Sequence, residues 1–345
     1  MDIFEIAQRA EGQTVKYHSG SCLRNFKNNS CQKCVKVCAQ KALAVNSGNI
    51  AFKKDECDSC GLCLTVCPTE CFKTEPRILK SVGKQLKTNP QAIFCCEASE
   101  QENAITVSCP AALSVGTLVF SALKTGAATV VFDNCDDCSI AKKSTAIVVK
   151  NVTQANNILQ RLGKKAQVTI LEKPVVVENK ISRNQFFKSI GTELIDVSVG
   201  SLSNKESERD FLLKMLENRK IKSNGISELP FFQLEIKDSC DHCLKCTKIC
   251  TSKALFAQAN EKIFSLRFKM NGCNGCGLCI DACPKKSIAI TNKADLSLLF
   301  KDQNLKETQA IYCPDCGDPF SRERESCDKC AKNKKLNKNI TSVFK

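Results

Sequence analysis

Hydrophobic and polar positions are most regular in the middle of the chain. Four short apolar runs there predict buried strands, at 91–96, 104–109, 128–132 and 166–171. Apolar residues at helical spacing predict helices at 110–124 and 152–162 between these strands. Strands that alternate with helices indicate a small parallel α/β sheet, which we place at residues 85–175 and expect to fold separately from the rest of the chain.

A second pattern occurs twice along the chain. After Cys38, a short helical segment leads into the alternating stretch NSGNIAF at 46–52. After Cys250, a similar segment leads into EKIFSLRF at 261–268. Each copy predicts a short helix followed by a pair of strands joined by a turn. The repetition indicates an internal duplication, with one copy at 15–80 and the other at 236–295.

The remaining segments are short or polar. We treat residues 1–14 as an N-terminal segment and 176–235 as a connector with one predicted helix at 206–218. A small cysteine-rich unit occupies 308–333, and a basic tail follows at 334–345. None of these segments except the cysteine-rich unit carries recognisable chemistry.

Cysteine carries the chemistry of this chain, which has 26 cysteines among 345 residues. The second copy contains two runs with gaps of two, two and three residues: Cys240, Cys243, Cys246, Cys250 and Cys273, Cys276, Cys279, Cys283. This is the ligand spacing of bacterial two-cluster iron–sulfur proteins, in which the fourth cysteine of each run binds the other run's cluster. We therefore predict two [4Fe–4S] clusters, one held by Cys240, Cys243, Cys246 and Cys283 and the other by Cys250, Cys273, Cys276 and Cys279.

The first copy departs from this spacing at one ligand. Its complete run, together with Cys38, predicts one [4Fe–4S] cluster held by Cys38, Cys57, Cys60 and Cys63. The other cluster has three clear ligands, Cys31, Cys34 and Cys67. Asn28 stands where its fourth ligand is expected, and we favour Cys22 as the substitute because a ligand is expected before Cys31. Cys71 is the competing candidate, and a three-ligand [3Fe–4S] site is the remaining alternative.

Five cysteines follow the predicted central strands: Cys95, Cys96, Cys109, Cys135 and Cys138. They predict a site at the carboxyl edge of the sheet, where open α/β sheets carry their ligands. Thiolates at this edge suit a [2Fe–2S] cluster, a zinc ion or a redox-active dithiol. Neighbouring strand residues face opposite sides, so Cys95 and Cys96 reach one site together only where the strand has ended.

The central region also resembles a known family. The similar segments are FCC (94–96), SCPAALS (108–114), LKTGAATVVF (123–132) and DNCDDC (133–138). They resemble the iron–sulfur delta subunit of the methyl-viologen-reducing hydrogenase over about residues 90–172. The resemblance implies a [2Fe–2S] cluster and the passage of electrons between a hydrogenase, or a formate dehydrogenase, and heterodisulfide reductase. Ser99 departs from the pattern, because the family usually has a further cysteine at that position.

The last cysteine-rich unit contains two Cys-x2-Cys knuckles, formed by Cys313, Cys316, Cys327 and Cys330. This spacing predicts a zinc ribbon, and a rubredoxin-like mononuclear iron is the alternative because CPDCG resembles a rubredoxin knuckle. The lysine-rich stretch 329–338 is interpreted as a solvated tail, with docking of an acidic partner as the alternative. His242, inside a Cys-x2-Cys loop, is expected to be exposed.

The formal net charge of +15 suggests a nucleic-acid partner, but this count treats the thiolates as neutral. Four cubanes, one two-iron site and one zinc contribute about −12 in total, which leaves about +3 and argues against nucleic-acid binding. Residues 1–12 lack a signal-peptide pattern, and the longest nearly apolar run, 111–123, is too short to span a bilayer. Thiolate ligands favour a reducing, anaerobic cytoplasm.

Motifs for flavin, nicotinamide or nucleotide binding do not occur, and no nucleophile stands beside a general base. We predict an α+β multidomain protein with two bacterial-ferredoxin-like modules, a central small α/β parallel-sheet domain and a C-terminal zinc-ribbon-like unit. Its predicted role is that of a polyferredoxin-type, non-catalytic electron-transfer subunit in a hetero-oligomeric complex with a catalytic redox enzyme, with soluble ferredoxin as a further partner. The alternative is a thiol or heterodisulfide reductase subunit that uses the central cysteines.

Overall fold

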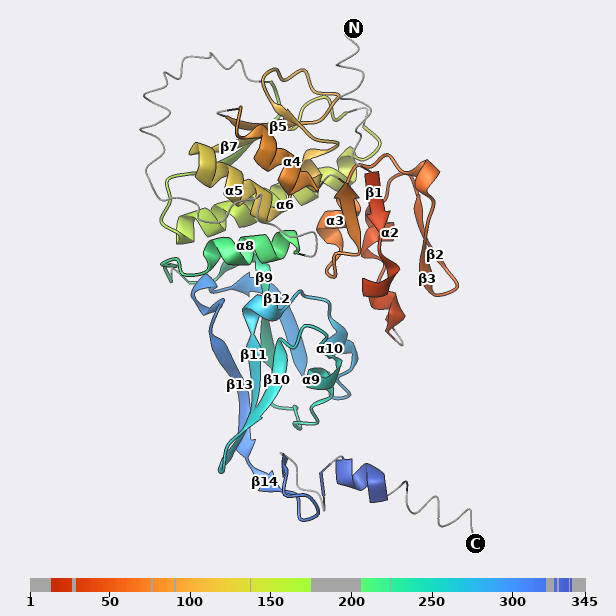
Figure 1. Ribbon diagram of the computed structural model, residues 1–345, viewed down its shortest axis with the longest axis vertical. Helices are drawn as coiled ribbons and strands as arrows, with labels where there is room; N and C mark the ends of the chain where they lie inside the picture. Colours follow the sequence, from red (N-terminus) through yellow and green to blue (C-terminus); the bar gives the residue numbers. More distant parts are fainter. Residues whose placement is uncertain are drawn as a thin grey trace. The chain divides into compact units, whose positions relative to one another are not determined.

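The computed structural model describes residues 14–26, 29–75, 77–89, 91–136, 138–174, 206–223, 225–320, 326–327, 329–334 and 336 (Figure 1). Asn28 and nearly all of the predicted N-terminal segment and basic tail lie outside these residues, as do positions 176–205 of the predicted connector. Contacts divide the chain into two compact units, Met1–Pro230 and Phe231–Lys345. In the described part of the chain, none of the helices combines the length and the hydropathy that crossing a bilayer requires.

The first unit begins with an N-terminal module at residues 14–75. It contains two antiparallel strand pairs, β1 (Thr14–Tyr17) with β4 (Phe72–Glu75) and β2 (Leu43–Asn46) with β3 (Asn49–Phe52). Its short helices are η1 (Ser19–Ser21), η2 (Leu23–Asn25), α2 (Lys33–Val37), η3 (Lys54–Glu56) and α3 (Leu62–Val66). Val15, Leu43, Ile50 and Phe72 bury their side chains together with the module's cysteines, so the cysteine loops wrap the core of the module.

A parallel four-stranded sheet forms the centre of the same unit. Its strand order is β6 (Ile105–Thr106), β5 (Ala92–Cys95), β7 (Ala128–Val131) and β8 (Val168–Leu171). The helices are α4 (Ile78–Gln85), η4 (Pro110–Ala112), α5 (Val115–Thr125) and α6 (Ala141–Arg161). The predicted helix at 110–124 is thus divided into the 3-10 turn η4 and the helix α5. Helix α5 starts at Val115 because Ser114 caps it by accepting a hydrogen bond from Thr117 N at 3.1 Å. The other predicted helix starts eleven residues before its predicted position, at Ala141.

Part of the predicted connector packs against this α/β region. Helix α8 (Glu208–Leu216) starts in a capping box, in which Ser207 and Asp210 exchange side-chain and backbone hydrogen bonds. Its apolar face buries Phe211, whose ring meets Phe120 of α5 edge-on at 5.5 Å. The burial of this face explains why a segment without recognisable chemistry is ordered.

The N-terminal module and the α/β region pack together within the first unit. Lys143 Nζ of α6 donates a hydrogen bond to the Cys38 carbonyl oxygen at 3.2 Å. Gly61 lies so close to η4 that a Cβ built on it would stand 2.6 Å from Ala112 Cβ. The first unit therefore brings the cysteine loop around Gly61 against the segment that begins at Cys109.

Residues 227–294, called the C-terminal module below, repeat the element order of the N-terminal module apart from its η1 and η2. Its elements are β9 (Ser227–Ile236), α9 (Lys245–Ile249), β10 (Leu255–Ala259), β11 (Ile263–Lys269), η6 (Met270–Gly272), α10 (Leu278–Asp281) and β12 (Ile288–Ala294). Strand β9 pairs with β12, and β11 lies between β10 and an added strand, β13 (Asp302–Gln309), which follows η7 (Leu296–Leu298). A small hairpin of β14 (Ile311–Tyr312) and β15 (Pro319–Phe320) follows.

Candidate metal centres

Four cysteines of the C-terminal module line one hollow of about 360 Å³: Cys240, Cys243, Cys246 and Cys283. The backbone N–H of Ser287 donates a hydrogen bond to Cys283 Sγ at 3.3 Å. Burial, followed by the thiolate charges of Cys240 and Cys243, raises the pKa of Cys246 to about 12. Thiols held this way keep their protons until a cation replaces them, so the donor set fits an iron–sulfur cluster.

The other four cysteines of this module form a second group, Cys250, Cys273, Cys276 and Cys279. Leu255 N–H donates to Cys250 Sγ at 3.5 Å. Burial, then the thiolate charges of Cys273 and Cys276, raises the pKa of Cys279 to about 12, and Cys250 adds to the same effect. Cys250 therefore lies beside the run that follows it in sequence, as the exchange of fourth ligands requires.

Residues 239–287 match the 4Fe-4S dicluster domain. The matched segment contains all eight cysteines of the two groups above. No curated protein matches the chain. This protein therefore contains a ferredoxin-type iron–sulfur domain, which is the C-terminal module.

The N-terminal module has a corresponding hollow of about 320 Å³ that is lined by five cysteines: Cys22, Cys31, Cys34, Cys67 and Cys71. Both candidates for the fourth ligand, Cys22 and Cys71, are thus among the lining residues. Burial, then the thiolate charges of Cys67 and Cys31, raises the pKa of Cys34 to about 11. This hollow fits the same kind of cluster and contains one cysteine more than the dicluster domain provides.

Cys71 occupies the position that Ser287 holds in the dicluster domain. Each residue follows the last cysteine of its run by four positions, and each donates its backbone N–H to that cysteine's sulfur at 3.3 Å. Each carbonyl oxygen accepts a backbone hydrogen bond from the residue after the first strand, His18 at 2.7 Å and Lys237 at 2.9 Å. The two positions are therefore equivalent in backbone geometry.

Cys22 and Cys71 have different neighbours within the hollow. Cys22 forms a side-chain hydrogen bond with Tyr17, the last residue of β1. Cys71 forms one with Cys67, and this bond is the main reason why the pKa of Cys67 falls to about 6. Thr69 Oγ1 lies 3.3 Å from Cys71 Sγ and 3.7 Å from Cys67 Sγ, so it contacts both sulfurs.

The remaining cysteines of the N-terminal module form a second group around Cys63. Burial, then the thiolate charges of Cys60 and Cys57, raises the pKa of Cys63, and Cys38 adds to the effect. The four predicted ligands Cys38, Cys57, Cys60 and Cys63 therefore lie near one another. Helix α3, which carries Cys63, begins after Gly61, whose φ of +78° suits glycine.

The central cysteines follow the carboxyl ends of the parallel strands. Strand β5 ends at Cys95, so Cys96 lies just beyond it. Cys95 packs with Ile93 and Val131 in an apolar cluster, and its thiol is hydrogen-bonded by Thr106 and Ser99. Cys95 is thus held in the body of the sheet.

Cys96 instead belongs to a group with three other cysteines. Burial, then the thiolate charges of Cys96 and Cys138, raises the pKa of Cys135 to about 11. Burial, with the thiolate charges of Cys60 and Cys96, raises the pKa of Cys109 to about 12. Cys109 therefore lies between the central cysteines and Cys60 of the N-terminal module.

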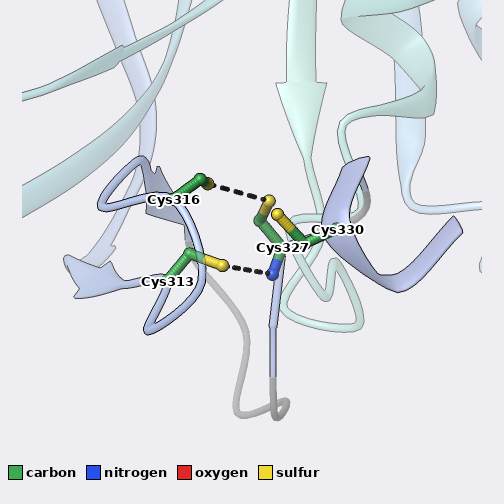
Figure 2. Close-up of side chains that lie close together, drawn as sticks. All are labelled: Cys313, Cys316, Cys327 and Cys330. Carbon is green, nitrogen blue, oxygen red and sulfur yellow. Dashed lines mark hydrogen bonds between the residues drawn. The ribbon is translucent and has the colours of Figure 1, made fainter. Parts of the chain in front are cut away.

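The last four cysteines point their sulfurs toward one another (Figure 2). The sulfurs of Cys313, Cys316, Cys327 and Cys330 all lie within 4.8 Å of one another, and those of Cys316 and Cys327 are 3.6 Å apart. A tetrahedral site with Zn–S bonds of about 2.3 Å has sulfurs about 3.8 Å apart, so the group fits one ion. Burial opposes ionisation of Cys313, but backbone N–H groups, including that of Cys327 at 3.2 Å, lower its pKa to about 6.

Several residues at these centres were missed or misplaced by the sequence analysis. The expectation that His242 is exposed is wrong, because its side chain is only 3% exposed and lines the hollow of Cys240, with Thr308 Oγ1 at 3.5 Å from Nδ1. Tyr17 and Glu70 were not singled out at all. Burial, then the charges of Glu208 and Asp210, raises the pKa of Glu70 to about 7. Glu70 directly precedes Cys71 in the sequence, which is the one local signal for it, whereas Tyr17 stands five residues from the nearest cysteine and has none.

Proposed function

We propose that this protein is a multi-cluster electron-transfer subunit that relays single electrons between a catalytic redox enzyme, such as a hydrogenase or a formate dehydrogenase, and another carrier. The observation that carries the proposal is the dicluster domain at 239–287, because paired cubanes transfer electrons one at a time and perform no substrate chemistry of their own. The second cysteine module in the same chain, with the same order of elements, supports a relay longer than one domain.

The N-terminal module is proposed to hold two further [4Fe–4S] clusters. One set of ligands is Cys38, Cys57, Cys60 and Cys63, and the other is Cys22, Cys31, Cys34 and Cys67. The choice of Cys22 is supported by the equivalence of Cys71 and Ser287, since the dicluster domain has a non-cysteine residue at that position. Cys22 lines the hollow together with Cys31, Cys34 and Cys67.

The central group is proposed to hold a [2Fe–2S] cluster with Cys96, Cys109, Cys135 and Cys138 as ligands and Cys95 outside the set. The apolar packing of Cys95 supports its exclusion, and the mutual influence of the other thiols supports their grouping. The nearness of Cys109 to Cys60 supports electron exchange between this site and the Cys60 cluster of the N-terminal module. The four cysteines from Cys313 to Cys330 are proposed to hold structural zinc, with mononuclear iron as the alternative.

The experiment that tests the proposal is the measurement of iron, sulfide and zinc in anaerobically purified protein, together with its EPR spectrum. Four cubanes and one two-iron centre give roughly 18 irons per chain, with one zinc. Fewer than about twelve irons after reconstitution would show that one cysteine module holds no cluster pair. A colourless protein that contains zinc alone would overturn the proposal and support a zinc-dependent nucleic-acid binder.

The partner and the compartment belong to the same proposal. A chain of one-electron centres needs a catalytic partner, so native purification from an anaerobic, reducing cytoplasm should recover a larger metalloenzyme subunit, with soluble ferredoxin as another exchange partner. The second candidate, a thiol or heterodisulfide reductase subunit, is favoured by the exposure of Cys138, which leaves one central thiol accessible to a substrate. Robust thiol-dependent turnover by the single chain would establish that candidate in place of the relay.

A further inference from the structure

The two cysteine modules differ at one position that contacts a ligand sulfur. We propose that Cys71 is a hydrogen-bond donor to the Cys67 sulfur. The cluster concerned is the one assigned to Cys22, Cys31, Cys34 and Cys67, called the Cys22–Cys34 cluster below. The bond raises the reduction potential of this cluster above that of the corresponding cluster of the dicluster domain, which is assigned to Cys240, Cys243, Cys246 and Cys283. The proposal rests on the proposed function, because it assumes that Cys67 is a ligand of the Cys22–Cys34 cluster. It assigns Cys71 a positioning role and leaves the ligation to Cys22.

The backbone geometry places the Cys71 thiol at the ligand. The Cys71 side chain is 2% exposed, so its thiol must find its partners inside the protein. Its neighbours are Cys67, with which it shares a hydrogen bond, and Thr69 Oγ1 at 3.3 Å. When Cys67 binds iron as a thiolate, its sulfur can only accept, so the proton of this bond must belong to Cys71.

The equivalent hydroxyl in the dicluster domain is hydrogen-bonded to other groups. Ser287 Oγ lies 2.8 Å from Ser239 Oγ and 3.4 Å from the Lys285 carbonyl oxygen. Counted from His18 and Lys237, the residue that corresponds to Ser239 is Gly20, which has no side chain to offer. Among the described residues, no heavy atom lies within 4 Å of a Cβ built on Gly20. The Cys71 thiol therefore has the ligand Cys67 and Thr69 Oγ1 as its partners, whereas the Ser287 hydroxyl has Ser239 Oγ and the Lys285 carbonyl oxygen.

A second donor, Tyr17, lines the same hollow. Tyr17 hydrogen-bonds to Cys22, and its ring stacks on Phe72 with the centroids 5.0 Å apart, which holds the phenol in place. The equivalent residue at the end of β9 is Ile236, which has no donor. The N-terminal hollow therefore has two side-chain donors to ligand sulfurs at positions where the dicluster domain has none.

The consequence for the potential follows from charge. A reduced cluster carries one more negative charge than an oxidised one, and donors to its sulfurs stabilise that charge, so each donor raises the potential. An electron that reaches the N-terminal module then resides preferentially on the Cys22–Cys34 cluster. The other cluster of the module, bound through Cys60, is the one beside the central cysteines. The module therefore draws electrons away from the central site.

The test is an EPR-monitored redox titration of the full chain and its Cys71→Ala variant, each with its iron content measured. We expect the variant to keep all its iron and to show a lower midpoint potential for one cluster, with the other clusters unmoved. Cys71→Ser keeps a hydrogen-bond donor, and Gly20 offers its hydroxyl no competing partner. Its midpoint potential for this cluster should therefore lie close to that of the wild type. Tyr17→Phe keeps the stacking on Phe72 and should lower the potential of the same cluster.

The reciprocal change tests the idea in the other module. The Ser239→Gly/Ser287→Cys double variant should raise the midpoint potential of one cluster in the dicluster domain. Loss of iron from Cys71→Ala would overturn the proposal by making Cys71 a ligand, and full iron with unchanged potentials in both Cys71→Ala and the double variant would overturn it as well. A wild-type protein without iron would instead overturn the proposed function, so the two failures are distinguishable.

Discussion

The N-terminal module and the dicluster domain share one backbone arrangement and differ in what surrounds it. Both have the same order of short helices and strands apart from η1 and η2 of the N-terminal module. Both also place a left-handed glycine after the second cysteine of the second run, Gly61 with φ +78° and Gly277 with φ +83°. A Cβ at Gly61 would collide with Ala112, whereas among the described residues no heavy atom lies within 4 Å of a Cβ at Gly277. The position of this glycine is therefore packed against Ala112 in one module and unobstructed in the other.

This difference shows how a repeated metal-binding unit acquires distinct roles. The cysteine spacing and the turns around it are local and recur in both modules. The residues that modify each centre do not recur, as Cys71 corresponds to Ser287, Glu70 to Lys286 and Tyr17 to Ile236. Because hydrogen bonds, charge and exposure around the sulfurs set cluster potentials, such replacements separate the properties of otherwise similar clusters.

The largest expected effect is a loss of iron, which tests whether Cys22 of the N-terminal module and Cys240 of the dicluster domain both act as cluster ligands. Cys22→Ser in the N-terminal module and Cys240→Ser in the dicluster domain should each remove roughly three to four irons, because each deprives one cubane of a thiolate. Cys71→Ser should leave the iron content unchanged. The measurement is iron per chain together with the EPR signals of the remaining clusters.

The opposite pattern would break the comparison. If Cys71→Ser lost a cluster while Cys22→Ser kept it, the fourth ligand of the N-terminal hollow would come from the far end of the cysteine run. The two modules would then differ in ligation and not only in surroundings.

An intermediate effect tests the packed loop. Gly61→Ala and Gly277→Ala should both lose about 1 kcal/mol of stability, because alanine is strained at positive φ. Gly61→Ala should lose a further 1–3 kcal/mol or so, since its Cβ collides with Ala112. Thermal unfolding of the apo and loaded chains measures both losses.

The matched rescue is Ala112→Gly in the Gly61→Ala background, which should recover the additional loss and leave the shared backbone cost. Equal destabilisation of Gly61→Ala and Gly277→Ala would show that a methyl group at position 61 has as much room as one at position 277. In that case the contact between Cys60 and the central cysteines would lose its structural support.

The smallest expected effect concerns Glu70 and its counterpart Lys286. Burial and the nearby Glu208 raise the pKa of Glu70 to about 7, so the folded protein keeps a proton that the unfolded chain loses near its ordinary value of about 4.5. Folding is therefore favoured at low pH, and this stabilisation is lost as pH rises through about 4.5 to 7. Glu70→Gln should remove the pH dependence and stabilise the protein by roughly 1–2 kcal/mol at pH 8, after allowance for partial exposure.

Urea unfolding of both proteins at pH 5 and pH 8 provides the measurement. Lys286→Gln is the matched control at the equivalent position of the dicluster domain, and it should not alter the slope of stability between these pH values. A Glu70→Gln protein that still lost stability between pH 5 and 8 to the same extent as the wild type would assign the effect to another group, with Glu208 the first candidate.

The sequence predicted the strands of the central sheet and the repeated helix–hairpin pattern, because alternation and helical spacing are local properties. It placed the start of α6 eleven residues too late, since the first turns of that helix carry few apolar residues at helical spacing. The packing of α8 on α5 was not predicted, because the apolar face of a short amphipathic helix does not specify which element it packs against. The contact between Gly61 and Ala112 was likewise not predicted, because it joins two segments that are far apart in the sequence.

What the sequence by itself determined is the identity of the ligand candidates. Gaps of two and three residues wrap a loop around a cluster whatever lies outside it, so the spacing alone predicted the eight cysteines of the dicluster domain. Only the tertiary structure decided which side chains contact those ligands. The burial of His242, the bond between Cys71 and Cys67 and the packing of Cys95 against Val131 all depend on segments brought together by packing, and no local pattern encodes the neighbours that packing supplies.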